Sequence, residues 1–143
     1  MARLPAVMAG LALLAAAGAA SAQASLKAIQ GRYTLGYDRC MKSPDGLSTM
    51  GMIDYIDGEI KIQDQRLNAA YAKALGDLTP GERRNLQAAQ RAWIAFRDAD
   101  CAARVDPEQW GSLSRINGNL CVLDRTIERT IELEAFPPNE IEQ

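Results

Sequence analysis

Apolar side chains recur at every third or fourth position over three long stretches, which is the spacing of one face of an α-helix. These stretches cover about residues 49–75, 80–105 and 116–136, and Thr49 is the expected N-cap of the first. The positions on the three faces are Ile53, Ile56, Ile60, Leu67, Ala70 and Ala74, then Leu86, Ala89, Trp93, Phe96 and Asp100, then Ile116, Leu120, Leu123, Ile127 and Ile131. No stretch alternates with a period of two for long enough to indicate a strand. The pattern therefore predicts an all-α fold.

Residues typical of helix ends separate these stretches. Gly76 ends the first, and Thr79, Pro80 and Glu82 then have the spacing of a capping box with proline at the first helical position. The second helix should end before Pro107, because the residue preceding a proline avoids the helical region. A connection of so few residues makes the first two helices antiparallel neighbours. We therefore expect a small bundle of about three antiparallel helices.

The flanking segments have different patterns. Residues 1–22 contain Arg3, an Ala/Leu-rich run and the sequence Ala-Ser-Ala, and this order is typical of a cleaved signal peptide. A membrane anchor is the alternative, but the run is short and is interrupted by proline and glycine. Residues 23–48 contain glycines and the turn sequence SPDG, so they predict a loop-rich N-terminal segment with room for one short helix. The helical domain then covers residues 49–136, and residues 137–143 form a tail.

Composition argues against several classes of function. The formal net charge is −2 at neutral pH, and removal of Arg3 makes the mature chain one unit more negative, so nucleic acid is not an expected partner. The chain has no histidine, which excludes a Ser-His-Asp or Cys-His nucleophile and the commonest metal ligand. Phosphate-binding glycine loops and paired C-x-x-C motifs are also missing, so we expect no cofactor, no metal and no enzymatic activity. A hydrolase that uses Asp98, Asp100 or Glu82 is a weak alternative, because adjacent carboxylates on a helix are usually solvated.

Three cysteines are present, at positions 40, 101 and 121. An exported protein folds in an oxidising compartment, where a disulfide is the expected use of cysteine. Cys101 lies near the end of the second helix and Cys121 near the start of the third, so a returning loop brings them together. We expect a Cys101–Cys121 disulfide that stabilises the domain by roughly 3 kcal/mol. Cys40 is left unpaired, either as a free thiol or as a partner for another molecule.

The sequence around Trp93 suggests core packing. Trp93 and Phe96 have helical spacing and are expected in the core, where Leu67 and Tyr71 would face them from the first helix. Ligand stacking by these aromatic rings is the alternative.

Arg97 is the centre of an expected polar network. Arg97 and Asp98 are helix neighbours, which do not face each other in the usual geometry. Arg97 is therefore expected to pair with Asp100 or to reach a carboxylate on another helix, in a network with Asn68 or Asp64.

The segments between helices are the expected partner surface, because loops carry function more often than packed helices do. These segments are residues 43–49 and 106–119. Trp110 and the nearby Ser112 are the candidate contacts, although Trp110 has the alternative role of covering the core.

Three motifs follow one another in the chain. They are D-x-x-L-N-x-x-Y, then A-Q-x-x-W-x-x-F-R-D-x-x-C, then Gly-Ser, a cysteine and T-x-x-R. With these motifs the chain resembles the LprI family of small exported bacterial proteins, over about residues 49–133. The signature positions are Asp64, Leu67, Asn68, Tyr71, Gln90, Trp93, Phe96, Arg97, Asp98, Cys101, Gly111, Ser112, Cys121, Thr126 and Arg129.

The resemblance implies a helical envelope domain, and one named member of the family is described as an inhibitor of lysozyme. Two departures stand out. Relatives often carry a second cysteine in an M-x-x-C setting, where this chain has Tyr55, so Cys40 lacks its expected partner. The lipid-anchoring cysteine of some relatives is also missing.

The resemblance therefore implies a periplasmic or secreted protein that binds and inhibits lysozyme, and we expect it to occlude a basic muramidase with its loops and acidic surface. The alternative is a periplasmic adaptor or stress-related protein with a different protein partner. No membrane span is expected after signal cleavage, and the pattern does not predict an oligomeric state.

Overall fold

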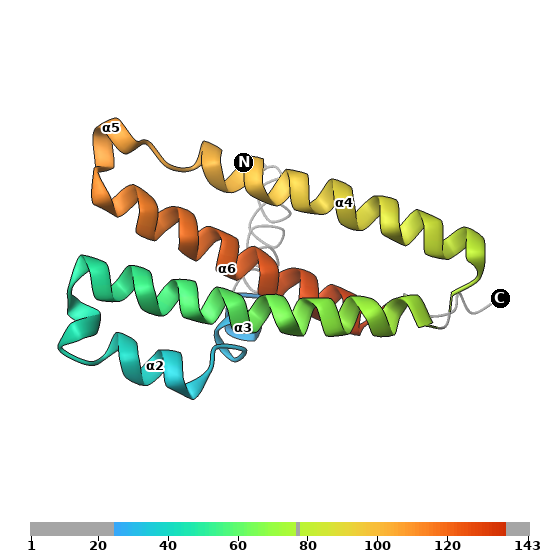
Figure 1. Ribbon diagram of the computed structural model, residues 1–143, viewed down its shortest axis with the longest axis horizontal. Coiled ribbons are helices and arrows are strands. Elements are labelled where there is room, and N and C mark those ends of the chain that lie inside the picture. Colours follow the sequence, from blue (N-terminus) through green and yellow to red (C-terminus); the bar gives the residue numbers. More distant parts are fainter. Residues whose placement is uncertain (1–24, 77, 137–143) are drawn as a thin grey trace, which may run out of the picture. The chain divides into compact units, whose positions relative to one another are not determined.

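The computed structural model describes residues 25–76 and 78–136 (Figure 1). The expected signal peptide, residues 1–22, and the tail, residues 137–143, lie outside the described residues. Within the described ranges, no helix combines the length and the apolarity that a membrane-spanning segment needs.

The chain divides between Arg32 and Tyr33 into two compact units. In the first unit, residues 25–30 are helical. The N–H of Gly31 then donates to the carbonyl of Lys27 at 3.0 Å, which closes the helix end.

The second unit is built from helices joined by short connections. Its elements in chain order are α2 (Leu35–Met41), the 3-10 turn η1 (Asp45–Leu47), α3 (Thr49–Gly76), α4 (Pro80–Ala103), α5 (Pro107–Trp110) and α6 (Ser112–Glu134). No strand occurs among the described residues. The predicted all-α fold is confirmed.

The segment before α3 is more helical than its glycines suggested, because it contains α2 and η1 as well as the helical residues 25–30. Ser48 provides the capping oxygen of α3 by accepting from the N–H of Gly51 at 3.0 Å, whereas Thr49, the expected cap, is the first helical residue. A Cβ at Gly51 would lie 1.9 Å from the carbonyl oxygen of Asp45. The close approach of η1 to α3 therefore requires glycine at position 51.

The capping box of α4 is confirmed. The Thr79 hydroxyl oxygen accepts from the backbone N–H of Glu82, and the Glu82 carboxylate accepts from the backbone N–H of Thr79 at 2.9 Å. Hydrogen bonds from Thr79, first from its hydroxyl and then from its backbone, lower the pKa of Glu82. Pro80 occupies the first turn, and α4 ends at Ala103, before Pro107 as expected.

The three long helices run in alternating directions, so that α3 and α6 are parallel to each other and antiparallel to α4 (Figure 1). α6 packs along α3 and also against α4, whereas α3 and α4 do not pack along their lengths. The first two long helices are thus antiparallel as expected, but α6 is the main partner of both. This arrangement leaves room between α3 and α4.

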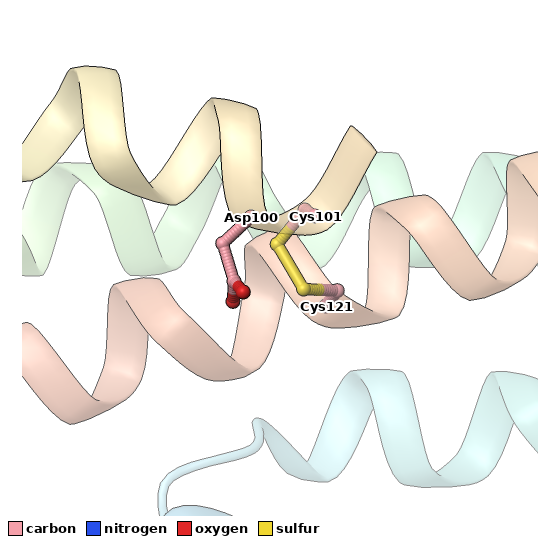
Figure 2. A group of neighbouring side chains, drawn as sticks. All are labelled: Asp100, Cys101 and Cys121. Atoms are coloured by element: carbon pink, nitrogen blue, oxygen red, sulfur yellow. A yellow bond between two sulfur atoms is a disulfide. The ribbon is translucent and has the colours of Figure 1, made fainter. Parts of the chain in front are cut away.

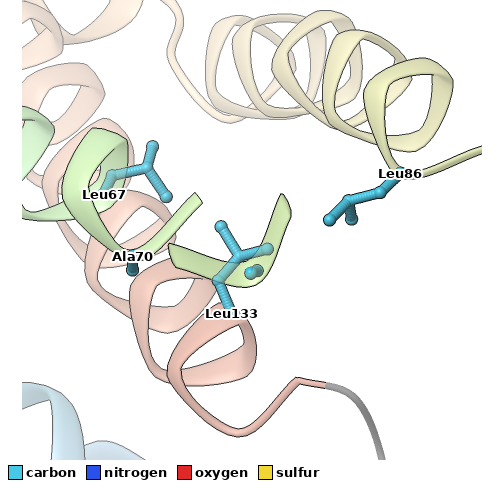
Figure 3. Close-up of a cluster of buried hydrophobic side chains, with 5 residues drawn as sticks. Leu67, Ala70, Leu86 and Leu133 are labelled. Carbon is cyan, nitrogen blue, oxygen red and sulfur yellow. The ribbon is translucent and has the colours of Figure 1, made fainter. Parts of the chain in front are cut away.

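A hydrophobic cluster joins the three helices near the α3–α4 connection (Figure 3). Its buried members are Leu67, Ala70, Ala74, Leu86 and Leu133, and Tyr71, Leu75, Leu78, Trp93 and Phe136 pack against them. Tyr71 and Trp93 thus share one cluster, as predicted. Farther along α3 and α6 the buried apolar residues are Ile53, Ile56, Ile116, Leu123 and Ile127.

The inward face of α4 differs from the predicted one. Ala89 is exposed and Phe96 is 57% exposed, so the prediction that Phe96 lies in the core is wrong. Successive residues of an α-helix are rotated by about 100° about the helix axis. Viewed down this axis, Phe96 therefore lies to one side of Trp93 and Arg97 to the other. The inward stripe is Leu86, Gln90, Trp93, Arg97 and Cys101. On α3, Ile60 is only half-buried, and the buried neighbour is Glu59.

The segment 106–119, which was expected to be a loop between helices, is largely helical. Asp106 caps α5 through bonds from two backbone N–H groups, and α6 begins at Ser112, four residues before the expected start at Ile116. Gly111 joins the two helices with a φ of 55°, a conformation that favours glycine.

Candidate functional site

The disulfide links the end of α4 to α6. Cys101 and Cys121 are bonded, with their Cα atoms 5.6 Å apart (Figure 2). The predicted pairing is confirmed, and Cys40 is a free thiol. The bridge closes the segment that contains α5, and therefore Trp110, into a loop.

Asp100 lies beside the disulfide (Figure 2) and is held by two arginines. Its carboxylate accepts from Arg104 at 2.9 and 3.0 Å and from Arg125 at 3.1 Å. The hydrogen bond from Arg104 is the largest cause of a lowered pKa at Asp100. Asp100, Cys101 and Cys121 are close enough to hold a metal ion. However, the sulfurs are joined in a disulfide and the carboxylate is in ion pairs, so this group stabilises the α4–α6 contact.

Several signature residues meet around Trp93, between α4 and α6. The guanidinium carbons of Arg97 and Arg129 lie 5.2 and 5.9 Å from the centre of the Trp93 ring, within cation–π range. Arg129 Nε donates to Gln90 Oε1 at 3.0 Å, and Arg97 donates to Thr126 Oγ1 at 3.4 Å. The signature residues Gln90, Trp93, Arg97, Thr126 and Arg129 therefore form one connected group of polar and aromatic contacts between α4 and α6.

The prediction that Arg97 pairs with Asp100 or with a carboxylate on another helix is wrong. Arg97 Nε donates to Asp98 Oδ1 at 2.8 Å, because the long arginine side chain folds around to its helix neighbour. Asp100 bonds to other arginines, and Asn68 donates to Asp64 at 3.2 Å within α3. Arg97 thus reaches α6 through Thr126, and not through a carboxylate, while it also contacts the Trp93 ring on its own helix.

A cavity of about 260 Å³ lies between α3 and α4. Six signature residues line it, namely Asp64, Leu67, Asn68, Tyr71, Gln90 and Arg97, and Gln87, Arg91 and Ile94 complete the lining. Two motifs separated in sequence therefore face one space, which neither motif alone could predict. Phe96 and Asp98, also signature residues, are exposed and do not line this cavity.

A buried carboxylate that the sequence pattern did not single out joins α2 to α3. Glu59 is 2% exposed and accepts from the Thr34 backbone N–H at 3.0 Å, from Thr34 Oγ1 at 2.6 Å and from Gln63 Nε2 at 2.7 Å. Thr34 in turn caps α2 by accepting from the N–H of Tyr37. Glu59 and Gln63 follow Ile56 at core-facing spacing, and this spacing was the available signal.

A second, partly buried contact joins Tyr33 to α6. The Tyr33 hydroxyl donates to Asp124 Oδ1 at 2.6 Å, and the Tyr33 ring lies 5.1 Å from that of Tyr37. Burial raises the pKa of Tyr33, and the bond to Asp124 raises it further, so the phenol remains the donor. Burial also raises the pKa of Asp124, against the opposing effect of the bond from Tyr33.

Cys40 and Tyr55 both line a smaller cavity of about 190 Å³ between α2 and α3. Tyr55 stands where the family resemblance places a second cysteine. The Tyr55→Cys variant is expected to form a disulfide with Cys40 in oxidising buffer. Closing a loop of about 15 residues contributes roughly 3 kcal/mol on the chain-entropy model, and loss of the tyrosine ring offsets part of this gain. We expect the thermal midpoint to rise by about 5 °C.

The matched control is the Tyr55→Cys, Cys40→Ser variant, which should show no rise. Recovery of both cysteines as free thiols from a non-reduced digest of Tyr55→Cys would contradict this interpretation of the cavity.

Trp110 is the last residue of α5 and Ser112 the first residue of α6, and Figure 1 shows α5 at the end of the unit where α3 and α6 both begin. Trp110 is 48% exposed and its Nε1 donates to Gln109 Oε1, while Ser112 is exposed at the start of α6. A hydrogen bond from Asn119 to Asp57 joins the first halves of α6 and α3. Other large apolar side chains exposed in this region are Leu47, Met50 and Leu113.

These features define a small helical domain with one disulfide. The connecting segments 43–49 and 106–119 lie at one end of it (Figure 1). The model of the family described as "Lysozyme inhibitor LprI" matches residues 40–133, which is more than half of the chain. The chain therefore belongs to the LprI family. A search of curated proteins and a search of solved structures each found no match.

Proposed function

We propose that this protein is an exported envelope protein that binds lysozyme and inhibits its muramidase activity. The observation that carries the proposal is the match of residues 40–133 to a family described as a lysozyme inhibitor. The disulfide supports export, because such bonds persist in oxidising compartments. The proposed location is the periplasm or the exterior, and the proposed action is binding without catalysis.

The proposed contact surface is the end of the unit that carries Trp110 and Ser112. An exposed tryptophan is a frequent anchor of protein interfaces, because it supplies a large contact area and one hydrogen-bond donor. The exposed side chains of Leu47, Met50 and Leu113 add apolar area in the same region. This surface is distinct from the exposed Phe96, which lies within α4.

The carboxylates do not support a hydrolytic reaction. Glu82 caps α4, Asp98 pairs with Arg97, and Asp100 pairs with two arginines. Each of these three carboxylates is thus engaged in a structural contact of its own, and the three do not share a partner. The acidic net charge of the chain instead favours encounter with a basic muramidase, as long as salt does not screen it.

Binding of chicken-type lysozyme by the Trp110→Ala variant is expected to be at least about tenfold weaker than binding by the unmodified protein. The reason is the loss of the main aromatic contact at the proposed surface. Isothermal titration calorimetry measures both dissociation constants. The Phe96→Ala variant is the matched control, since it removes an aromatic ring of similar exposure elsewhere, and it should bind normally.

A weaker interaction in Phe96→Ala with normal binding in Trp110→Ala would move the contact to α4. No binding by the unmodified protein would reject lysozyme as the partner. A single endogenous protein recovered repeatedly from envelope extract would then favour the adaptor alternative.

A further inference from the structure

The cavity between α3 and α4 has features of a ligand site. Its volume of about 260 Å³ is just below the ~300 Å³ at which pockets for drug-sized ligands begin. A single sugar ring or an acylated amino acid is an appropriate size. The lining combines amides and guanidinium groups with the apolar surfaces of Leu67, Tyr71 and Ile94.

Gln90, which lines this cavity, carries a hydrogen-bond donor that has no partner among the described residues. It is only 7% exposed, and its Oε1 accepts from Arg129 Nε. Arginine can only donate, so this bond fixes which end of the amide carries the nitrogen. No acceptor for Gln90 Nε2 occurs among the described residues, and none of their fully enclosed side-chain nitrogens or oxygens lacks a partner. The Nε2 group is therefore not fully enclosed, and the side chain that carries it lines the cavity.

Arg91 supplies an available positive charge beside Gln90. No carboxylate in residues 25–76 and 78–136 forms an ion pair with Arg91, whereas the charge of Arg97 is matched by Asp98 at 2.8 Å. On the opposite wall, Asn68 donates to Asp64 and keeps its own carbonyl oxygen available as an acceptor. The cavity thus offers a cationic donor and an amide donor on α4, and acceptors on α3.

We propose that this cavity binds a small carboxylate that also carries hydroxyl or amide groups. Arg91 and Gln90 hold the carboxylate, Asn68 and Asp64 accept from the hydroxyl or amide groups, and Tyr71 covers the apolar side. Such a ligand can come from a sugar acid or from the carboxyl end of a peptide. The proposal is independent of lysozyme inhibition, since the cavity contains no residue of the Trp110 surface.

The test is a nuclear magnetic resonance titration of the ¹⁵N-labelled protein purified after export. The probes are D-glucuronate and N-acetylalanine, and their neutral counterparts are D-glucose and N-acetylalaninamide. We expect each carboxylate to shift the side-chain amide resonance of Gln90 saturably. The neutral counterparts should bind at least about tenfold more weakly, because they lack the charge-assisted bond.

Arg91→Ala should weaken binding of the carboxylates at least about tenfold, whereas Arg84→Ala, which removes another exposed arginine of α4 outside the cavity, should not. Tighter binding of D-glucuronate identifies a sugar acid as the ligand source, and tighter binding of N-acetylalanine identifies a peptide. An unchanged Gln90 resonance, equal binding of the neutral probes, or unaltered binding in Arg91→Ala would each overturn the proposal.

Discussion

Replacement of Cys101 and Cys121 by serine together is expected to lower the free energy of unfolding by about 3 kcal/mol. The bridge spans a sequence separation of 20, and its loss restores conformational freedom to the unfolded chain. The effect is large for this fold because α4 packs on α6 but not along α3. Urea unfolding of the variant and of the unmodified protein measures the difference.

The same variant should bind lysozyme more weakly, because the loop closed by the bridge carries Trp110. The Cys40→Ser variant is the control, since it removes a thiol that forms no bridge. It should retain both stability and binding. Equal stability of the double variant and the unmodified protein would contradict the structural role of the bridge.

Glu59→Ala is the second large change, with an expected loss of stability on the order of 3 kcal/mol. It removes the buried carboxylate that accepts from the Thr34 backbone N–H, the Thr34 hydroxyl and the Gln63 amide. We expect α2 to lose its attachment to α3. Hydrogen exchange of the α2 amides, together with urea unfolding, measures both effects.

Glu59→Gln provides the control, because it keeps the shape of the side chain and one acceptor oxygen. The Thr34 hydroxyl can then turn to accept from the new amide. This variant should lose less than half as much stability as Glu59→Ala. Equal exchange rates in α2 for Glu59→Ala and the unmodified protein would contradict the proposed attachment.

Features that depend on neighbouring residues were predictable from the sequence. The capping box needs only Thr79, Pro80 and Glu82, and the structure contains it. The Cys101–Cys121 pairing needs only a returning loop between two helices, and it is also present. In both cases the partners are close in sequence, within one helix start or across one short returning segment, so the spacing limited the possible geometries.

The inward face of α4 was less predictable. Phe96 and Arg97 both have a spacing that places them near Trp93, and hydrophobicity favoured Phe96. The structure instead turns Arg97 inward, where it contacts the Trp93 ring and Thr126. Because α4 packs mainly against one helix, its inward face is too narrow to include Phe96.

The burial of Glu59 and the helices in the segment 106–119 were not predicted. The first depends on a distant partner, and the second on a proline that is compatible with both a helix end and a helix start. Glu59 is buried because Thr34, 25 residues earlier, satisfies its oxygens. Spacing within α3 does not identify such a partner. In the segment 106–119, Pro107 suggested a break, yet proline at the first helical position after the Asp106 cap also starts a helix. The same residues thus mark both the end of α4 and the start of α5.

The clearing of a cell-wall suspension by chicken-type lysozyme tests the central claim most directly. The rate of clearing is measured as purified protein is added in increasing amounts. Inhibition through a specific complex predicts that the rate falls with each addition and approaches zero as the protein reaches and passes an equal molar amount. A clearing rate that stays unchanged at a large molar excess of the protein would contradict lysozyme inhibition.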